Sequence, residues 1–411
     1  MIIKINMKIN MKINMGTFDK LLSNVLILSL LAISCRTSST KADSHIITFN
    51  LNKLPKISEV KLSDLGFTDI EYILLETNDQ SMVPMINNVL FGDNYFLTLF
   101  FTNILMYRYD GKFVTKIGTE GRGPEEFTVV HDVDINRNNQ KIYLADGWQK
   151  KFYVYSETGG FVNTFRTYIQ GDISFRFTED GILCYNKNSL GNVENSYTLI
   201  DTSGKIIKNF PNKYLWNLRQ KNTVIFNENL FYRFNNKLYK KEIYSDTIFI
   251  FEHSYFKPHL IIKHGDKLLT TKARSEYDPR ILSEKFISQK NLFEFGDYIY
   301  YEFTYDSKRN EGITFKGFIG SKKDNTQFLI NSENGIVNDL DGGPGFWPKT
   351  IKDDRTVVSW VEALKLKKYI DSDLFKNSTP KYPEKKKELE KLANSLKESD
   401  NPVLMIVRLK E

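Results

Sequence analysis

The segment Ile104-Leu-Met-Tyr-Arg-Tyr-Asp-Gly-Lys-Phe-Val-Thr-Lys-Ile117 sets an Asp-Gly pair between two runs rich in aromatic and β-branched residues. An Asp-Gly pair in that position predicts a β-hairpin. The pattern returns in Lys151–Phe165 and in Ser196–Phe210, and the glycines of the three turns are 49 and 44 residues apart. That period matches a unit of about four strands, which is the size of one β-propeller blade.

The rest of the chain supports further blades of this kind. Strand-like runs separated by turn residues predict blades near 84–117, 128–166, 171–210, 222–251 and 290–330. A sixth blade would take strands from both ends of the chain, Ile46–Leu51 and Val403–Leu409. Pairing the two ends closes the ring and removes exposed sheet edges. We therefore expect an all-β fold over residues 45–411, a six-bladed β-propeller of four-stranded antiparallel blades.

One helix interrupts the β pattern near the C-terminus. Pro383 can serve as the first helical residue, and Leu389, Leu392, Ala393 and Leu396 follow the i, i+3, i+4, i+7 spacing of one helix face. The spacing predicts a helical insertion at about 383–398, packed on the wall or rim of the propeller.

The segments between blades carry a family resemblance. Gly118-x-x-Gly-x-Gly-Pro-x-x-Phe127 is followed by Val133-Asp-Ile135 and by Ile142-Tyr-Leu-Ala-Asp146. This succession resembles NHL-type propellers and, more closely, the six-bladed β-propeller lipoproteins of Bacteroides-like bacteria. The resemblance extends over nearly the whole mature chain, including Ile70–Glu76 and Ser399–Met405. It implies that Asp146 is a structural aspartate that holds backbone amides.

The N-terminus is predicted to be an export signal. Lysines precede the apolar run Val25–Ile33, which is too short to span a bilayer as a helix. The cysteine that follows, Cys35, resembles the lipidated cysteine of bacterial lipoproteins, although Ala32 stands where leucine is common. We expect a lipoprotein signal peptide at 1–34, lipid attachment at Cys35 and a polar tether at 35–44. The alternative is a secretory peptide that is cleaved elsewhere.

The lipid anchor predicts an outer-membrane lipoprotein of the bacterial cell envelope. Surface export of such lipoproteins is associated with acidic residues soon after the cysteine. Here Arg36 follows it and the first acidic residue is Asp43, which favours the periplasmic leaflet over the cell surface.

Charge and cysteine content narrow the classes of partner and chemistry. The net charge of +7 falls to +4 once residues 1–34 are excluded, and nucleic-acid binding usually needs a focused basic face. We therefore expect no nucleic-acid partner. Because Cys35 and Cys184 are the only cysteines, lipidation of Cys35 leaves no intramolecular disulfide. Cys184 alternates like a strand residue and is expected to be a small buried hydrophobe.

Two loops offer candidate ligand-binding residues. The glycines around Arg122 resemble a phosphate-binding loop, but Pro124 and Glu125 lead into more strand, which favours a turn between blades. Arg122 itself is a candidate to face the central channel. Trp347, in the rigid segment Pro344–Pro348, is a candidate to stack on a sugar or peptide, and packing between blades is the alternative.

A metal site is the weaker possibility that the sequence raises. Asn338, Asp339 and Asp341 precede two glycines, as oxygen ligands often do in calcium loops, but a tight turn stabilised by Asx hydrogen bonds would have the same sequence. His131 is the only histidine beside paired carboxylates, in His131-Asp-Val-Asp134. Calcium is the one cofactor considered, and otherwise no cofactor is expected.

Two functions remain open at this stage. No nucleophile elbow or HExxH motif occurs, so no catalytic residue is assigned. We expect a lipid-anchored recognition or scaffold module for a glycan, a peptide or an envelope protein. The alternative is a metal-dependent hydrolase or lyase with its site at the central channel, since propellers host both binding and catalysis.

Overall fold

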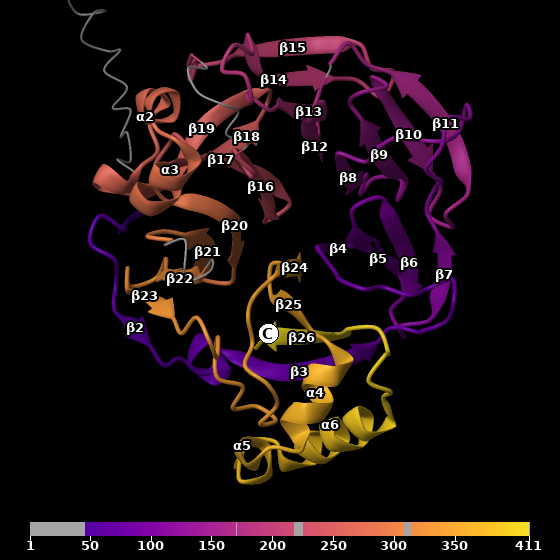
Figure 1. Cartoon of the computed structure of the whole chain (residues 1–411), viewed down its shortest axis with the longest axis vertical. Helices are drawn as coiled ribbons and strands as arrows, with labels where there is room; N and C mark the ends of the chain where they lie inside the picture. Colours follow the sequence, from indigo (N-terminus) through magenta and orange to yellow (C-terminus); the bar gives the residue numbers. More distant parts are fainter. Residues whose placement is uncertain (1–45, 170, 218–224, 308–313, 411) are drawn as a thin grey trace, which may run out of the picture. The chain divides into compact units, whose positions relative to one another are not determined.

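The computed structural model describes residues 46–410 apart from 170, 218–224 and 308–313. These residues form six sheets arranged as blades around a central axis (Figure 1). From the innermost strand outwards, blade 1 contains β4 (Asn88–Phe91), β5 (Tyr95–Phe100), β6 (Asn103–Arg108) and β7 (Phe113–Lys116). Blade 2 contains β8 (Asp132–Ile135), β9 (Ile142–Asp146), β10 (Lys151–Tyr155) and β11 (Phe161–Arg166). Blade 3 contains β12 (Ile173–Thr178), β13 (Gly181–Asn186), β14 (Asn195–Ile200) and β15 (Ile206–Pro211).

The last three blades are less regular. Blade 4 contains β16 (Asn229–Phe234), β17 (Lys237–Glu242), β18 (Thr247–Glu252), β19 (Tyr255–Lys263) and β1 (Thr48–Asn50). Blade 5 contains β20 (Ser288–Phe295), β21 (Tyr298–Thr304), β22 (Phe315–Ser321), β23 (Gln327–Ile330) and β2 (Ile57–Ser58). Blade 6 contains β24 (Thr350–Asp353), β25 (Thr356–Val361), β26 (Val403–Leu409) and β3 (Phe67–Leu74). The expected six-bladed propeller is confirmed, with a fifth strand on blades 4 and 5.

Blade 6 closes the ring with strands from both ends of the chain, but not with the N-terminal strand expected from the sequence. β26 pairs antiparallel with β3, so that Ile406 lies opposite Glu71. Ile46–Leu51 instead contributes β1, which lies parallel to β19 at the edge of blade 4. β3 matches β26 in length, with eight residues against seven, and it buries Phe67, Ile70 and Ile73. These two properties make β3 the better partner for β26.

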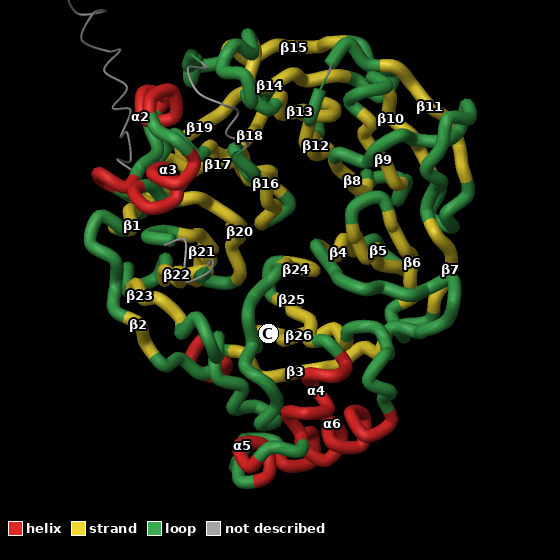
Figure 2. The backbone as a smooth tube through the Cα atoms, in the orientation of Figure 1, coloured by secondary structure: helices red, strands yellow, loops and turns green. Residues whose placement is uncertain are grey.

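The helices lie at the periphery of the ring (Figure 2). The predicted C-terminal helix is present as α6 (Pro383–Ser395), and it packs with α4 (Ala363–Ile370) and α5 (Asp373–Lys376) against blade 6. The expected helical insertion is therefore confirmed, and the structure adds α4, α5 and the pair α2 (Thr271–Glu276) and α3 (Pro279–Lys285), which the sequence did not predict. Over the described residues, no helix is long and apolar enough to cross a membrane.

Aromatic side chains fill the spaces between neighbouring blades. Phe152 of blade 2 meets Phe175 of blade 3 edge to face at 4.9 Å between ring centroids, and Tyr143 meets Phe177 at 4.6 Å. Cys184 is fully buried in the same cluster, where burial raises the pKa of its thiol. Sheet-on-sheet packing of this kind accounts for the aromatic content of 14%.

Asp146 fixes the connection between blades 1 and 2. One carboxylate oxygen accepts hydrogen bonds from the Thr128 amide and hydroxyl at 2.8 and 2.7 Å and from the Val129 amide at 3.2 Å. The other accepts the Trp148 and Gln149 amides at 3.1 and 3.0 Å. These contacts match the structural role that the resemblance implied for Asp146.

Candidate functional site

The innermost strands enclose a channel at the centre of the ring. Its cavity has a volume of about 830 Å³ and is lined by residues of all six of these strands, β4, β8, β12, β16, β20 and β24. A pocket of this size can hold part of a polymer or a small molecule, and converging polar groups make it the first candidate for a binding site.

The channel has a face that its connections identify, here called the mouth face. Because strands alternate in direction within each blade, the segments that precede the innermost strands and the loops between second and third strands leave the sheets at one end. Phe101 and Phe226 belong to such segments, and both line the cavity. The mouth face is therefore the end of the channel at which these connections help to line the cavity.

Exposed apolar side chains gather on the mouth face of blades 1 to 4. Six of them, here called the apolar rim, are between 55% and 82% exposed: Met85, Phe101, Trp148, Tyr168, Leu190 and Phe226. Trp148 contacts the ring of His131 edge to face at 5.7 Å, and His131 lines the cavity. Three members of the apolar rim therefore reach the channel: Phe101 and Phe226 line the cavity, and Trp148 contacts His131, which lines it.

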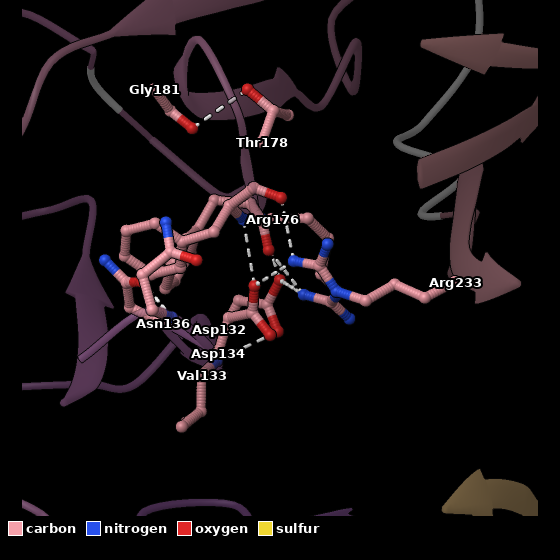
Figure 3. A network of polar contacts seen from close by, with 11 residues as sticks. Asp132, Val133, Asp134, Asn136, Arg176, Thr178, Gly181 and Arg233 are labelled. Atoms are coloured by element: carbon pink, nitrogen blue, oxygen red, sulfur yellow. Dashed lines mark hydrogen bonds and ion pairs between the residues drawn. The ribbon is translucent and has the colours of Figure 1, made fainter. Parts of the chain in front are cut away.

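The carboxylates beside His131 are held by arginines from two other blades (Figure 3). Asp132 accepts from the Phe175 amide at 2.8 Å and from the Arg176 guanidinium at 2.7 Å. Burial raises the pKa of Asp132, while the positive charge of Arg176 opposes that shift. The first carboxylate is therefore paired with a cation of blade 3.

Asp134 makes the equivalent connection one step further along β8. It accepts from the Phe177 amide at 2.9 Å and from Arg233 at 3.1 Å, and Arg233 also donates to the Phe177 carbonyl at 2.8 Å. Arg233 comes from β16, so the two carboxylates tie blades 2, 3 and 4 together (Figure 3).

His131 is held neutral at this site. Its Nδ1 accepts the Gly147 amide at 3.1 Å, and burial lowers the pKa of its ring. Its ring lies edge to face against Trp148 at the wall of the cavity.

The charges of the cavity lining do not balance. Four of its five carboxylates form ion pairs: Asp132 with Arg176, Asp134 with Arg233, Asp172 with Lys187, and Glu228 with Arg274. Four further cations line the cavity without a salt bridge to any described residue: Arg137, Lys290, Lys349 and Lys352. The fifth carboxylate, Glu302, accepts a hydrogen bond from Trp347 at 3.1 Å. The channel therefore carries an excess of positive charge.

Neither Trp347 nor Arg122 lines the cavity. The half-buried Trp347 packs against the main apolar core and donates its indole N–H to Glu302. Arg122 is exposed in the connection that leads into β8, on the mouth face. Direct ligand binding by either residue stays a prediction.

The glycine loop around Arg122 is a turn, as the sequence favoured. The Glu126 carboxylate accepts the Gly123 amide at 2.7 Å. A Cβ atom on Gly121 would lie 1.9 Å from a Glu126 carboxylate oxygen. Glu126 thus occupies the space in which a phosphate-binding loop would hold its anion.

The proposed calcium ligands do not line the cavity, and Asn338 donates to the Tyr72 hydroxyl of β3, the outermost strand of blade 6, at 3.3 Å. Asn338 donates its amide to Asp341 at 2.6 Å, and Asp341 also accepts the Gly343 amide at 2.8 Å. Asp339 instead accepts from the Ser63 amide and hydroxyl at 3.1 and 2.5 Å. Within the described ranges, no three His, Cys, Asp or Glu side chains are grouped to hold a metal ion. Calcium binding at this loop stays a prediction.

Comparison with known proteins gives a family and a fold. The family model described as "Domain of unknown function (DUF4934)" matches residues 46–408. A Bacteroides fragilis protein for which export is proposed is similar in structure, with a TM-score of 0.67 and 17% identity over 89% of this chain and 100% of that one. A DUF4221 member from Bacteroides vulgatus has a TM-score of 0.46 and 10% identity over 64% and 86%. No curated protein matches the sequence.

Proposed function

The chain belongs to the family described as Domain of unknown function (DUF4934), a six-bladed propeller family, and from its geometry we propose that it binds a glycan chain at the mouth face. The observation that carries the proposal is the apolar rim, which lies on the mouth face of blades 1 to 4 beside a polar cavity of about 830 Å³. Aromatic side chains beside a pocket with converging polar groups are typical of a binding site.

The composition of the rim favours a glycan. Phe101, Trp148 and Phe226 are exposed aromatic side chains of the kind that stack on the apolar faces of sugar rings, while the cavity beside them offers charged and amide groups for hydroxyls. A pocket with aromatic walls and a few converging polar groups suits a ligand with both kinds of surface.

Affinity electrophoresis tests this proposal directly. The purified full chain in detergent is run through gels that contain one polysaccharide each, from a panel of neutral, uronate-containing and sulfated polymers. We expect at least one polymer to retard the protein, and bovine serum albumin to migrate unchanged. If no polymer retards the chain, glycan recognition is the wrong function.

We further propose that Cys35 carries the lipid anchor in the bacterial cell envelope. Cys35 lies outside the described residues, and support comes from the preceding apolar run and from the export proposed for the Bacteroides fragilis structural relative. Two or more acyl chains on one cysteine give stable anchoring, whereas one chain alone is marginal.

Replacing Cys35 with Ser is expected to abolish both lipidation and membrane association, since the hydroxyl does not substitute for the acylated thiol. Metabolic labelling with radioactive palmitate, followed by cell fractionation, measures both. Cys184→Ala is the matched control and should keep full labelling, because Cys184 is buried in blade 3. A labelled, membrane-bound Cys35→Ser chain would contradict the anchor.

The leaflet is a separate proposal. The basic residue after Cys35 favours the periplasmic leaflet, so protease added to intact cells should leave the propeller uncut. Cleavage in intact cells, with a periplasmic marker protein preserved, would place the chain on the cell surface.

A further inference from the structure

The unbalanced charge of the channel has a local centre where blades 5 and 6 meet. Lys349 leads into β24, and Lys290 lies on β20, the neighbouring innermost strand. Both residues line the cavity. On the opposite side, Asp132 and Asp134 are each paired with an arginine. Of the four cavity cations without a salt bridge to a described residue, Arg137 follows β8 on that side, whereas Lys290, Lys349 and Lys352 lie on this wall.

The backbone around Lys349 is fixed, so its side chain starts from a defined position. The Lys349 amide donates to the Val358 carbonyl at 3.0 Å, and the Lys349 carbonyl accepts from the Asn291 side chain at 2.6 Å. Burial lowers the pKa of Lys349, the Glu302 carboxylate opposes that shift, and the positive charge of Lys290 adds to it. The ammonium group is thus partly desolvated without a salt bridge among the described residues.

Among the described residues, Glu302 is the carboxylate that acts on Lys349, and both lysines act on Glu302 in turn. It is buried with 4% exposure, and its carboxylate is held by the Trp347 indole. Burial raises the pKa of Glu302, while Lys349 and Lys290 oppose that shift. One carboxylate held in this way compensates at most one of the two lysines.

We propose that Lys349 and Lys290 form a subsite for a carboxylate or sulfate group on the glycan bound at the mouth face. This inference rests on the proposed function and adds the class of ligand, an acidic glycan. An oxyanion that contacts the half-buried Lys349 and the exposed Lys290 would supply the counter-charge that the described protein groups leave out.

The rim makes a glycan the better occupant than an acidic peptide. Trp148 is 69% exposed and Phe101 is 74% exposed on the face that leads to the lysines. Stacking on such rings needs flat apolar faces, which a sugar ring offers at every residue of a polymer. An acidic peptide would satisfy the lysines but leave most of these rings uncovered.

Affinity electrophoresis and calorimetry with the full chain in detergent test the subsite. The probes are polygalacturonate for carboxylate, chondroitin sulfate for sulfate, a neutral β-glucan, and poly-L-glutamate. We expect an acidic glycan to bind more tightly than the neutral one. Lys349→Gln and Lys290→Gln should each weaken that binding about tenfold, as the loss of a charge-assisted contact does.

Two further variants separate a contact from a general effect. Lys116→Gln removes the same charge from an exposed position on β7 and should leave binding unchanged. Glu302→Gln removes the competing negative charge but keeps an oxygen for Trp347, so it should bind the acidic glycan at least as tightly as the wild type. If Glu302 only supported the fold, Glu302→Gln would weaken binding of the acidic glycan instead.

The outcomes distinguish this inference from the function on which it rests. Equal binding of neutral and acidic glycans, unaffected by Lys349→Gln, would overturn the subsite and leave glycan recognition intact. Preference for poly-L-glutamate would overturn the assignment to a glycan. Absence of binding to every probe would overturn both proposals.

Discussion

Replacing Asp134 with Ala is expected to lower the free energy of unfolding by about 3–5 kcal/mol, because it leaves the Arg233 guanidinium in a largely buried position without its counter-charge. Asp134 is 6% exposed, and it also accepts the Phe177 amide at 2.9 Å. The variant therefore loses a contact to blade 3 and another to blade 4 at once.

Urea denaturation, monitored by intrinsic fluorescence, measures this change in the free energy of unfolding. Glu284→Ala is the matched control, since Glu284 pairs with the exposed Arg280 on α3 at 3.0 Å, and such pairs contribute about 0.5 kcal/mol or less. The loss in free energy of unfolding for the double variant Asp134→Ala/Arg233→Ala should be smaller than the sum of the two single losses by roughly 1–3 kcal/mol. Strict additivity would show that the two side chains do not interact.

The double variant Phe101→Ala/Trp148→Ala is expected to lose about 3 kcal/mol of glycan binding, roughly a hundredfold in affinity. The reason is that both rings are exposed at the mouth face and stand where a bound sugar would stack. Because neither ring lies in the core, the free energy of unfolding should change by less than about 1 kcal/mol. Calorimetry with the polymer that retards the wild type measures the affinity.

A control on the opposite face separates stacking from a general loss of aromatic surface. Tyr255, the first residue of β19 after the turn from β18, is 64% exposed at the other end of blade 4. Tyr255→Ala should bind the glycan as the wild type does. Equal affinities for wild type and the Phe101/Trp148 double variant would remove the rim from the binding site.

The sequence predicted the regular blades well because their turns are local. The hairpin around Asp110 and Gly111 needs only neighbouring residues to form, and Gly111 has the positive φ of 81° that its turn requires. The same local pattern located blades 2 and 3.

Blade 6 could not be assembled from local patterns. Its strands β25 and β26 are separated by α4, α5 and α6, so the repeat of about 45 residues is lost. The choice between β1 and β3 as the closing strand depends on which apolar residues fit the neighbouring blades, and that fit is a property of the assembled ring.

The charged residues of the channel were missed for a related reason. Arg176 stands between Phe175 and Phe177, and Arg233 stands between Tyr232 and Phe234, as any solvent-facing polar residue of a strand would. Alternation shows that a side chain leaves the apolar face, but not whether it meets solvent or another blade. Asp132 and Asp134 were visible as a pair, whereas their partners come from strands that lie 44 and 99 residues further along.

Hydrogen–deuterium exchange with and without the bound polymer tests recognition at the mouth face most directly. If a glycan binds there, amides in the loops 100–103 and 147–150 should exchange more slowly in the complex, while the turns at 109–112 and 156–160, on the opposite face, should not change. Slower exchange in those opposite turns, with the mouth loops unaffected, would contradict binding at the mouth face.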